Sequence, residues 1–549
     1  MSEPLLRVRD LAVAFDGEDG VTRAVDGVSL DLAAGEVLAL VGESGCGKSV
    51  TALTLMGLLG APNARTSGSV RYAERELIGA PEDDLRRLRG EELAMVFQDP
   101  LSSLNPVLRI GDQVAEQILA HRAVSRREAR ERAVALLGRV GMPEPDERAS
   151  SYPHQLSGGM RQRAMIAMAL SCEPRILIAD EPTTALDVTV QAQILDLIRE
   201  LQAETGAGVL LITHDFGVVA ELADRVAVMD AGRIVEQGSA EEVFEHPRDA
   251  HTQRLLAAVP RLDGPLPERP GARAGDPVLA LDDLEVSFPA GRRRLLRRDG
   301  GERLRAVDGV TLSIGAGETV GLVGESGCGK STLARAAVRL LEPSAGRVGF
   351  AGRDITRSSR RELAPLRAEL QIVFQDPYGS LNPRKKAREI VGLPLRLHGV
   401  PKDEVGARVD ALLERVGLEP AHADRWPHEF SGGQRQRIGI ARALALSPRL
   451  VVLDEPVSAL DVSVQAQIVA LLDDLQRELG LSYLFISHDL SVVRQVADRV
   501  AVMRAGKLVE IGSVADVYER PAHPYTAELL RAVPVPDPRR RTAAVPHDR

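Results

Sequence analysis

The sequence predicts an α/β protein in which one large domain occurs twice, because three kinds of pattern appear in both halves. Short motifs recur in unchanged order, short apolar runs alternate with helical segments, and a glycine-rich loop follows an apolar run in each half. Alternating strands and helices are typical of a parallel sheet covered by helices. A repeat of this length indicates that a whole domain was duplicated, in contrast to a solenoid of small units.

The recurring motifs carry the evidence for the duplication. GESGCGKS begins at Gly42 and again at Gly324, and DEP begins at Asp180 and again at Asp454. VFQDP, SGG and HD recur in each half in matching order. Proline and glycine cluster between the halves, which indicates a linker. We therefore predict a first domain, a linker, a second domain and a polar tail, with bounds 1–262, 263–276, 277–534 and 535–549.

A helical insertion is predicted in each domain between its VFQDP and SGG motifs. Residues 404–416 place Val405, Val409 and Leu413 on one face of a helix. Residues 127–140 repeat this apolar face in the first half. Spacings of three and four residues are typical of an amphipathic helix that packs on a core.

Composition and charge disfavour several classes of function. The net charge of −9, the pI near 5.8 and an aromatic content of only 3% are unlike those of proteins that bind nucleic acid. The three cysteines show no metal-ligand spacing, so a reducing cytoplasm is expected. No apolar run approaches the ~18 residues of a membrane span. If the protein acts at a membrane, other chains are expected to span it.

The glycine-rich loops match the phosphate-loop pattern G-x-x-x-x-G-K-[ST] and follow the predicted strands 37–41 and 319–323. Backbone N–H groups and a helix N-terminus would surround phosphate, lysine would neutralise it, and serine would bind Mg²⁺. An ordinary glycine-rich turn is the alternative, but two identical matches at equivalent positions make it negligible. The predicted ATP-binding residues are Gly42, Gly45, Gly47, Lys48, Ser49, Gly324, Gly327, Gly329, Lys330 and Ser331.

Two acids end a predicted buried strand in each half. We assign Asp180 and Asp454 to Mg²⁺, through water, and Glu181 and Glu455 to the attacking water as general bases. Strand-end acids are more often surface caps, but in a domain with a phosphate loop we favour the catalytic role.

Amides, histidines and aromatics also follow or end apolar strands. Gln98 and Gln375 are expected to reach both Mg²⁺ and the lytic water, and His214 and His488 the γ-phosphate. A purely structural role is the alternative for the histidines. Two further side chains either stack on adenine, which we favour, or belong to the core; they are Phe15 and Phe288.

Together these motifs resemble ATP-binding-cassette proteins. LSGGMRQR at 156–163 and FSGGQRQR at 430–437 look like the family signature, and the match covers both halves almost end to end. QDPLSSLNP, QDPYGSLNP and the terminal HPYTAELLRAVP are similar to motifs of ATPases that serve oligopeptide, dipeptide and nickel importers. The resemblance implies two tandem phosphate-loop NTPase domains of this type, fused into one ATPase.

The resemblance also implies a mechanism and partners. ATP is expected between the two halves, where the signature of one half completes the site of the other. Two integral-membrane permease subunits and an extracytoplasmic solute-binding protein are implied, with the chain at the cytoplasmic face of the cell membrane. No iron–sulfur cluster is expected, because the cysteine group that some relatives carry after the first domain is missing. The implied signature contacts are Ser157, Gly158, Gly159, Ser431, Gly432 and Gly433.

One departure and two alternatives stay open at this stage. The HPY motif of the second half aligns with His246–Gln253 in the first, where it is lost. A tandem cassette acting on ribosomes or nucleic acid is the rival function; such proteins are expected to carry a long charged linker or zinc cysteines. A purely regulatory nucleotide binder is the third reading, which the retained Glu181 and Glu455 disfavour.

Overall fold

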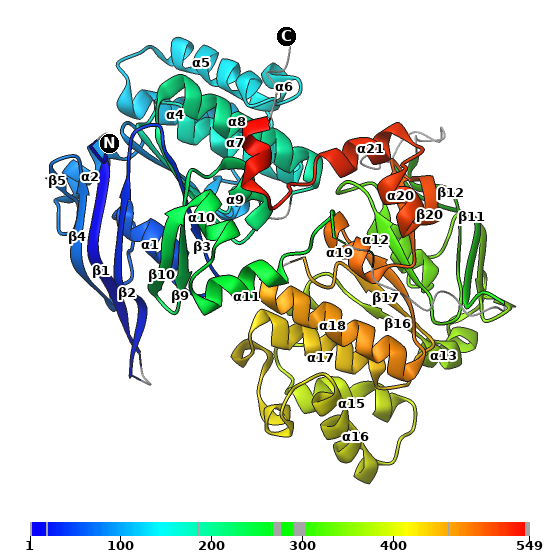
Figure 1. Ribbon diagram of the computed structural model, residues 1–549. Helices are drawn as coiled ribbons and strands as arrows, with labels where there is room; N and C mark the ends of the chain where they lie inside the picture. Colours follow the sequence, from blue (N-terminus) through cyan, green and yellow to red (C-terminus); the bar gives the residue numbers. More distant parts are fainter. Residues whose placement is uncertain are drawn as a thin grey trace. The chain divides into compact units, whose positions relative to one another are not determined.

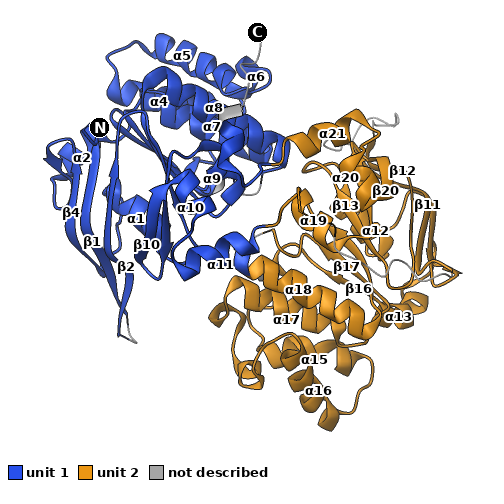
Figure 2. Ribbon diagram, viewed as in Figure 1, with its two compact units in different colours: residues 1–259, 461–463, 534–549 blue, residues 260–460, 464–533 orange. Residues whose placement is uncertain are grey.

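The computed structural model describes residues 3–17, 20–183, 186–264, 266, 276–289, 303–458 and 460–543. The chain divides into two compact units, coloured separately in Figure 2. Unit 1 contains residues 1–259, 461–463 and 534–549, and unit 2 contains residues 260–460 and 464–533. The predicted linker 263–276 lies mostly outside the described residues, and the predicted domain bounds stay a prediction.

Unit 1 is built on two sheets (Figure 1). A six-stranded sheet has the order β10-β9-β3-β8-β7-β6; only β10 is antiparallel to its neighbour. A four-stranded antiparallel sheet has the order β2-β1-β4-β5. The elements in chain order are β1 (Leu6–Gly17), β2 (Gly20–Leu32), β3 (Val37–Val41), α1 (Lys48–Leu55), β4 (Ala64–Tyr72), β5 (Arg75–Glu76), α2 (Glu82–Leu88), β6 (Leu93–Val96), α3 (Pro100–Ser103), α4 (Ile110–His121), α5 (Arg126–Arg139), α6 (Pro145–Ala149), η1 (Pro153–Gln155), α7 (Gly158–Leu170), β7 (Ile176–Asp180), α8 (Val188–Thr205), β8 (Gly208–Thr213), α9 (Phe216–Leu222), β9 (Arg225–Asp230), β10 (Arg233–Ser239), α10 (Ala240–Glu245) and α11 (Ala250–Ala258).

The second half of the chain repeats both sheets. The six-stranded sheet has the order β16-β17-β18-β13-β19-β20, and the four-stranded sheet has the order β12-β11-β14-β15. The elements are β11 (Leu279–Pro289), β12 (Arg303–Ile314), β13 (Thr319–Val323), α12 (Lys330–Ala337), β14 (Ala345–Phe350), β15 (Arg353–Asp354), α13 (Arg360–Glu369), β16 (Leu370–Val373), α14 (Pro377–Ser380), α15 (Ala387–Leu397), α16 (Lys402–Arg415), η2 (Pro420–Asp424), η3 (Pro427–Glu429), α17 (Gly432–Leu444), β17 (Leu450–Asp454), α18 (Val462–Leu479), β18 (Ser482–Ile486), α19 (Leu490–Val496), β19 (Arg499–Arg504), β20 (Lys507–Ser513), α20 (Val514–Glu519), α21 (Pro524–Arg531) and η4 (Pro538–Ala543).

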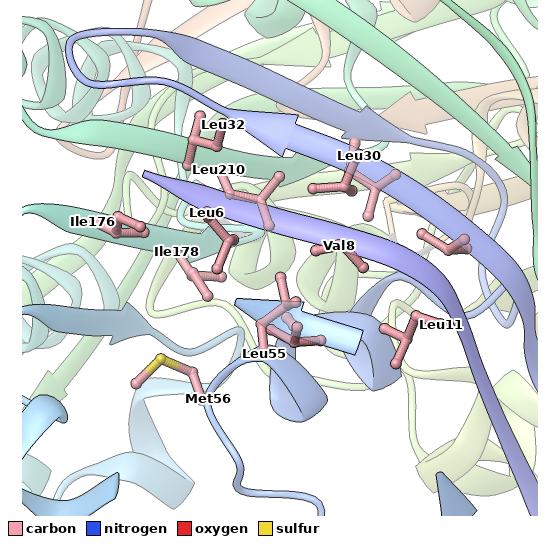
Figure 3. Packing of buried hydrophobic residues seen from close by; sticks show 14 of the residues in the cluster. Leu6, Val8, Leu11, Leu30, Leu32, Leu55, Met56, Ile176, Ile178 and Leu210 are labelled. Carbon is pink, nitrogen blue, oxygen red and sulfur yellow. The ribbon is translucent and has the colours of Figure 1, made fainter. Parts of the chain in front are cut away.

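The main core of unit 1 lies between its two sheets. Figure 3 shows side chains of β1 and β2, such as Leu6 and Leu30, gathered with Ile178 of β7 and Leu210 of β8. All five residues of β3 are buried, as expected for a parallel strand covered on both faces. Burial of such aliphatic side chains contributes about 1.5–3 kcal/mol each. The core thereby fixes β3 and β7, whose carboxyl ends carry the candidate site.

The predicted helical insertion consists of α3 to α6 in unit 1. Ser125 begins α5 by accepting a hydrogen bond from the Glu128 N–H, and Ala129, Ala133 and Leu137 form its buried face. In unit 2, α16 buries Val405, Val409 and Leu413. Both faces agree with the predicted ones.

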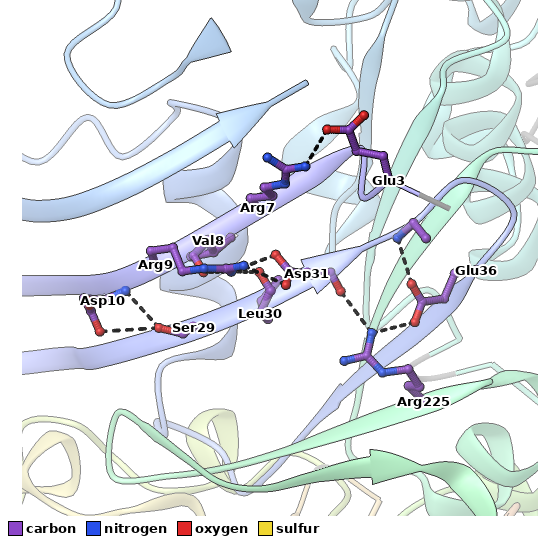
Figure 4. A network of polar contacts seen from close by, with 11 residues as sticks. Glu3, Arg7, Val8, Arg9, Asp10, Ser29, Leu30, Asp31, Glu36 and Arg225 are labelled. Carbon is purple, nitrogen blue, oxygen red and sulfur yellow. Dashed lines mark hydrogen bonds and ion pairs between the residues drawn. The ribbon is translucent and has the colours of Figure 1, made fainter. Parts of the chain in front are cut away.

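A carboxylate ties the start of β3 to its neighbours (Figure 4). Glu36 accepts hydrogen bonds from the Arg225 guanidinium at 2.8 Å and from the Ala33 N–H at 2.7 Å. Glu318 contacts Arg499 and the Gly315 N–H in the same way at 3.1 and 2.6 Å. The duplication therefore preserves a polar anchor at the strand that leads into each glycine-rich loop.

None of the helices in the described part of the chain is both long enough and apolar enough to cross a membrane.

Candidate nucleotide sites

Each phosphate loop joins a buried strand to a helix, as predicted. The loop 42–49 connects β3 to α1, and the loop 324–331 connects β13 to α12. Gly47 precedes α1 with a left-handed φ of 108°, and a Cβ there would lie 2.2 Å from the Ala24 carbonyl oxygen. Gly329 repeats both features, with φ of 112° and 2.1 Å to the Ala306 oxygen. Only glycine fits at these positions.

The loop lysines are buried and bound by the loops themselves. Lys48 Nζ donates to the Gly42 carbonyl oxygen at 2.7 Å and to that of Glu43 at 2.8 Å. Lys330 Nζ donates to Gly324 and Glu325 at 2.6 and 2.8 Å. Each ammonium is therefore held at a fixed place beside its loop.

A serine and an aspartate form the candidate cation site in each half. Ser331 Oγ donates to Asp454 Oδ1 at 2.9 Å, and Ser49 bonds the Asp180 side chain. Burial raises the pKa of both aspartates, and the serine hydroxyl opposes that shift. Asp180 Oδ1 is buried and has no hydrogen-bond partner within the described part of the chain. Hydroxyl and carboxylate oxygens suit Mg²⁺, so the residues fit this cation.

The predicted glutamate, glutamine and histidine of the first half meet at one point. Gln98 Nε2 donates to Glu181 Oε2 at 2.8 Å, and His214 Nδ1 lies 3.2 Å from Glu181 Oε1. Glu181 has a left-handed φ of 48°, and its N–H donates to the Ile212 carbonyl oxygen. A positive φ at glutamate is strained and is retained only where the surroundings enforce it. The glutamine donates to the glutamate here, and its predicted contacts with Mg²⁺ and the lytic water stay a prediction.

The second half repeats this cluster. Gln375 Nε2 donates to Glu455 Oε2 at 2.7 Å, and His488 Nδ1 lies 3.4 Å from the same oxygen. Glu455 has a φ of 49°. Burial favours protonation of Glu455, but the hydrogen bond and charge of His488 outweigh it and lower the pKa of Glu455. Burial likewise opposes the charge on His488, yet Glu455 raises the pKa of this imidazole.

These opposite shifts predict a pH effect of His488→Gln. The pair is charged between the lowered pKa of Glu455 and the raised pKa of His488, and its stabilisation is lost above and below that window. Without the imidazolium, Glu455 loses its strongest pKa-lowering partner, while burial still raises its pKa against Lys330 and Ser458, so the base is protonated at higher pH. We expect the acid limb of the ATPase pH profile to move to higher pH. An unmoved acid limb, equal to that of the exposed control His428→Gln, would contradict the pairing.

The signature residues begin helices α7 and α17. The Ser157 hydroxyl accepts a hydrogen bond from the Met160 N–H, and the Ser431 hydroxyl accepts one from the Gln434 N–H. A Cβ at Gly433 would lie 2.3 Å from Val464 Cγ1, so a side chain there would displace this contact. The start of each helix therefore carries a serine hydroxyl and the backbone of two glycines. That these groups contact ATP stays a prediction.

The two aromatic candidates differ in their surroundings. Phe15 lies near the end of β1 and packs, partly buried, against the core cluster of unit 1. Phe288 lies near the end of β11 and is 39% exposed. The packing of Phe15 agrees with the core role that we considered for it. Stacking on adenine stays a prediction for both residues.

The loop cysteines supply a second test of the site. Cys46 Sγ lies 3.8 Å from Lys48 Nζ, and burial raises the pKa of both Cys46 and Cys328 despite the nearby ammonium groups. A raised pKa leaves little thiolate, so iodoacetamide should react slowly. We expect Mg·ATP to protect both thiols and complete labelling to abolish ATP binding, measured by peptide mass spectrometry and equilibrium dialysis in a Cys172→Ser chain. Full ATPase activity after complete labelling would refute the assignment.

Comparison with known families decides what kind of protein carries these sites. The ABC transporter family model matches residues 25–184 and again residues 307–458. The chain belongs to the ABC transporter family. A second model, the oligopeptide/dipeptide transporter C-terminal region, matches residues 235–280 and 509–548. Both halves are therefore ABC ATPase domains that bind and hydrolyse ATP, and the chain is the ATPase component of a transporter.

Curated relatives extend over nearly the whole chain. The glutathione import ATP-binding protein GsiA of Salmonella typhimurium is 51% identical over 568 aligned residues, covering 98% of this chain and 91% of the relative. The peptidoglycan transport ATP-binding protein YejF of Agrobacterium fabrum is 52% identical, covering 97% of this chain and 96% of the relative. Among solved structures, cbiO1 from Clostridium perfringens is 32% identical over 45% of this chain and 92% of that chain, with a TM-score of 0.39.

Proposed function

We propose that this ATPase energises the import of peptides or related small solutes through partner permease subunits in the membrane. The observation that carries the proposal is the end-to-end match, at about half identity, to import ATP-binding proteins, combined with an oligopeptide/dipeptide-type C-terminal region in each half. Two integral-membrane permeases and an extracytoplasmic solute-binding protein are the proposed partners. The chain then acts at the cytoplasmic face of the cell membrane.

We propose the same division of labour in each nucleotide site. Lys48 and the loop backbone bind the β- and γ-phosphates, and Glu181 accepts the proton of the attacking water. Gln98 orients the Glu181 carboxylate through the 2.8 Å hydrogen bond, and the His214 imidazole contacts its other oxygen at 3.2 Å. Lys330, Glu455, Gln375 and His488 have these roles in the second half.

The proposed cofactor is Mg²⁺ together with ATP. Ser49 and Asp180 would hold the cation in the first half, and Ser331 and Asp454 would hold it in the second. When bound, Mg²⁺ neutralises charge on the β- and γ-phosphate oxygens. We further propose that the signature residues at 157–159 and 431–433 complete the site of the opposite half, so that ATP is enclosed between the halves. Closure and release would then drive the permeases.

A transport assay tests the proposal. The chain would be reconstituted in liposomes with two candidate permease subunits and a candidate solute-binding protein from the same organism. Uptake of glutathione, a dipeptide, a longer peptide and Ni²⁺ would be measured with ATP inside the vesicles. We expect ATP-dependent uptake of at least one peptide and none with a chain lacking both general bases. Uptake of Ni²⁺ alone, or ATPase activity stimulated by ribosomes in place of permeases, would overturn the peptide assignment.

A further inference from the structure

The HPY helix of the second half contacts the phosphate loop of that half. Tyr525, in the first turn of α21, is buried, and its hydroxyl oxygen accepts a hydrogen bond from the Glu325 N–H at 3.2 Å. Glu325 is the second residue of the loop 324–331. The Arg504 guanidinium carbon lies over the Tyr525 ring, 4.6 Å from its centre. Burial raises the pKa of Tyr525, so the phenol stays neutral at physiological pH.

The first half has the same scaffold but a different side chain. Glu236 accepts hydrogen bonds from the N–H groups that precede α11, and Glu510 accepts the matching ones before α21. This register places His251 where the second half has Tyr525. Thr252 and Thr526 follow in the two helices and are both fully buried. The two positions are therefore structurally equivalent.

His251 makes other contacts than Tyr525. Its Nδ1 lies 3.7 Å from Asp230 Oδ2 and 3.5 Å from Arg254 Nη2. Its Nε2 is buried and has no partner within the described part of the chain. Asp230 ends β9 and Arg504 ends β19, so these two residues occupy equivalent positions. The first half therefore pairs His251 with an aspartate where the second half pairs Tyr525 with an arginine. Within the described residues of unit 1, nothing accepts a hydrogen bond from the Glu43 N–H, the counterpart of Glu325.

We propose that Tyr525 is a positioning residue that fastens the second phosphate loop to helix α21, and that the first loop lacks this fastening. The two nucleotide sites then differ in one contact: the Tyr525 hydroxyl holds the Glu325 N–H of the second loop before ATP arrives, while, within the described residues, the first loop has no such contact with helix α11. Helix α21, which carries the HPY motif, thereby raises the ATP affinity of its own half through the hydrogen bond between Tyr525 and Glu325. The inference rests on ATP binding by the family and holds whatever solute is transported.

Tyr525→Phe tests the fastening, because it removes one oxygen and keeps the ring against Arg504. Binding of a fluorescent ATP analogue with Mg²⁺ would be measured in full-length chains where Lys48→Ala has disabled the first loop. We expect the dissociation constant of the ATP analogue at the second site to rise about 3- to 10-fold, because one hydrogen bond is lost. In the Lys330→Ala background, which reports the first site, Tyr525→Phe should change nothing.

Tyr483→Phe is the matched control. Tyr483 is also buried, and its hydroxyl donates to the Leu472 carbonyl oxygen at 3.0 Å, away from the loop. We expect it to leave ATP affinity unchanged. An unaltered affinity in Tyr525→Phe, or an equal loss in Tyr483→Phe, would overturn the proposal, since either result makes the Tyr525 contact merely structural.

A second readout follows the loop itself. A loosened second loop should expose Cys328, so Tyr525→Phe is expected to speed iodoacetamide labelling of Cys328 several-fold while Cys46, in the same molecule, keeps its rate. Equal acceleration of both thiols would indicate general destabilisation and would count against the proposal. The converse graft, His251→Tyr with Asp230→Arg, should tighten ATP binding by the first site; a graft that still binds ATP with unchanged affinity would overturn the claimed asymmetry.

Discussion

Replacing Glu181 and Glu455 together by glutamine is expected to stop ATP hydrolysis while ATP stays bound. Glutamine has nearly the shape of glutamate and can still accept the hydrogen bond that Gln98 donates at 2.8 Å. It cannot accept a proton from water, so the general-base contribution is lost. We expect steady-state ATPase activity to fall by about 100-fold or more. Filter binding should recover unhydrolysed ATP with the doubly substituted chain, because the phosphate loops are untouched.

The double substitution Glu36→Gln with Glu318→Gln is the matched control. These glutamates are also shielded carboxylates, but they contact Arg225 and Arg499 at the starts of β3 and β13. The control is expected to lower the melting temperature and to keep most of the ATPase activity. If the Glu181/Glu455 variant retained more than about a tenth of the wild-type rate, the assignment of these residues as general bases would be wrong.

Replacing Lys48 and Lys330 together by alanine is expected to weaken ATP binding strongly. Each buried ammonium is already fixed by two loop carbonyl oxygens, so it meets the phosphates without being reordered. Charge-assisted hydrogen bonds contribute about 1.5–3 kcal/mol each, so the loss of one or two per site weakens binding by about 100-fold. Isothermal titration of the full chain with Mg·ATP measures the effect.

Two further double variants serve as controls for the lysine experiment: one replaces the loop lysines by arginine, and the other replaces two exposed lysines by alanine. Lys48→Arg with Lys330→Arg is not expected to restore binding, because a planar guanidinium cannot donate to the same two carbonyls from a buried pocket built for an ammonium. Lys385→Ala with Lys507→Ala removes two exposed lysines that pair with Glu389 and Asp308, and it should bind ATP normally. Wild-type affinity in the arginine variant would refute the requirement for a compact ammonium.

Local patterns in the sequence were sufficient for the elements that carry the loops. The strands before the loops were predicted at 37–41 and 319–323, which are the bounds of β3 and β13. The helix predicted at 404–416 is α16, Lys402–Arg415, and the helix predicted at 127–140 is α5, Arg126–Arg139. Such elements are set by apolar periodicity, by capping residues and by glycine at positive φ, all of which act over a few residues.

The sequence by itself determined the duplication, the α/β class, the phosphate loops and the family, because each depends on residue types at short spacings. Only the tertiary structure decided which side chains touch. Gln98 meets Glu181 across 83 residues, and Tyr525 meets the Glu325 backbone across 200. The first contact arises because a parallel sheet brings the carboxyl ends of distant strands to one edge. The second arises because α21 packs beside the phosphate loop, a long-range contact that motif spacing does not predict. The HPY motif was visible in the sequence, but its contact with the phosphate loop was not.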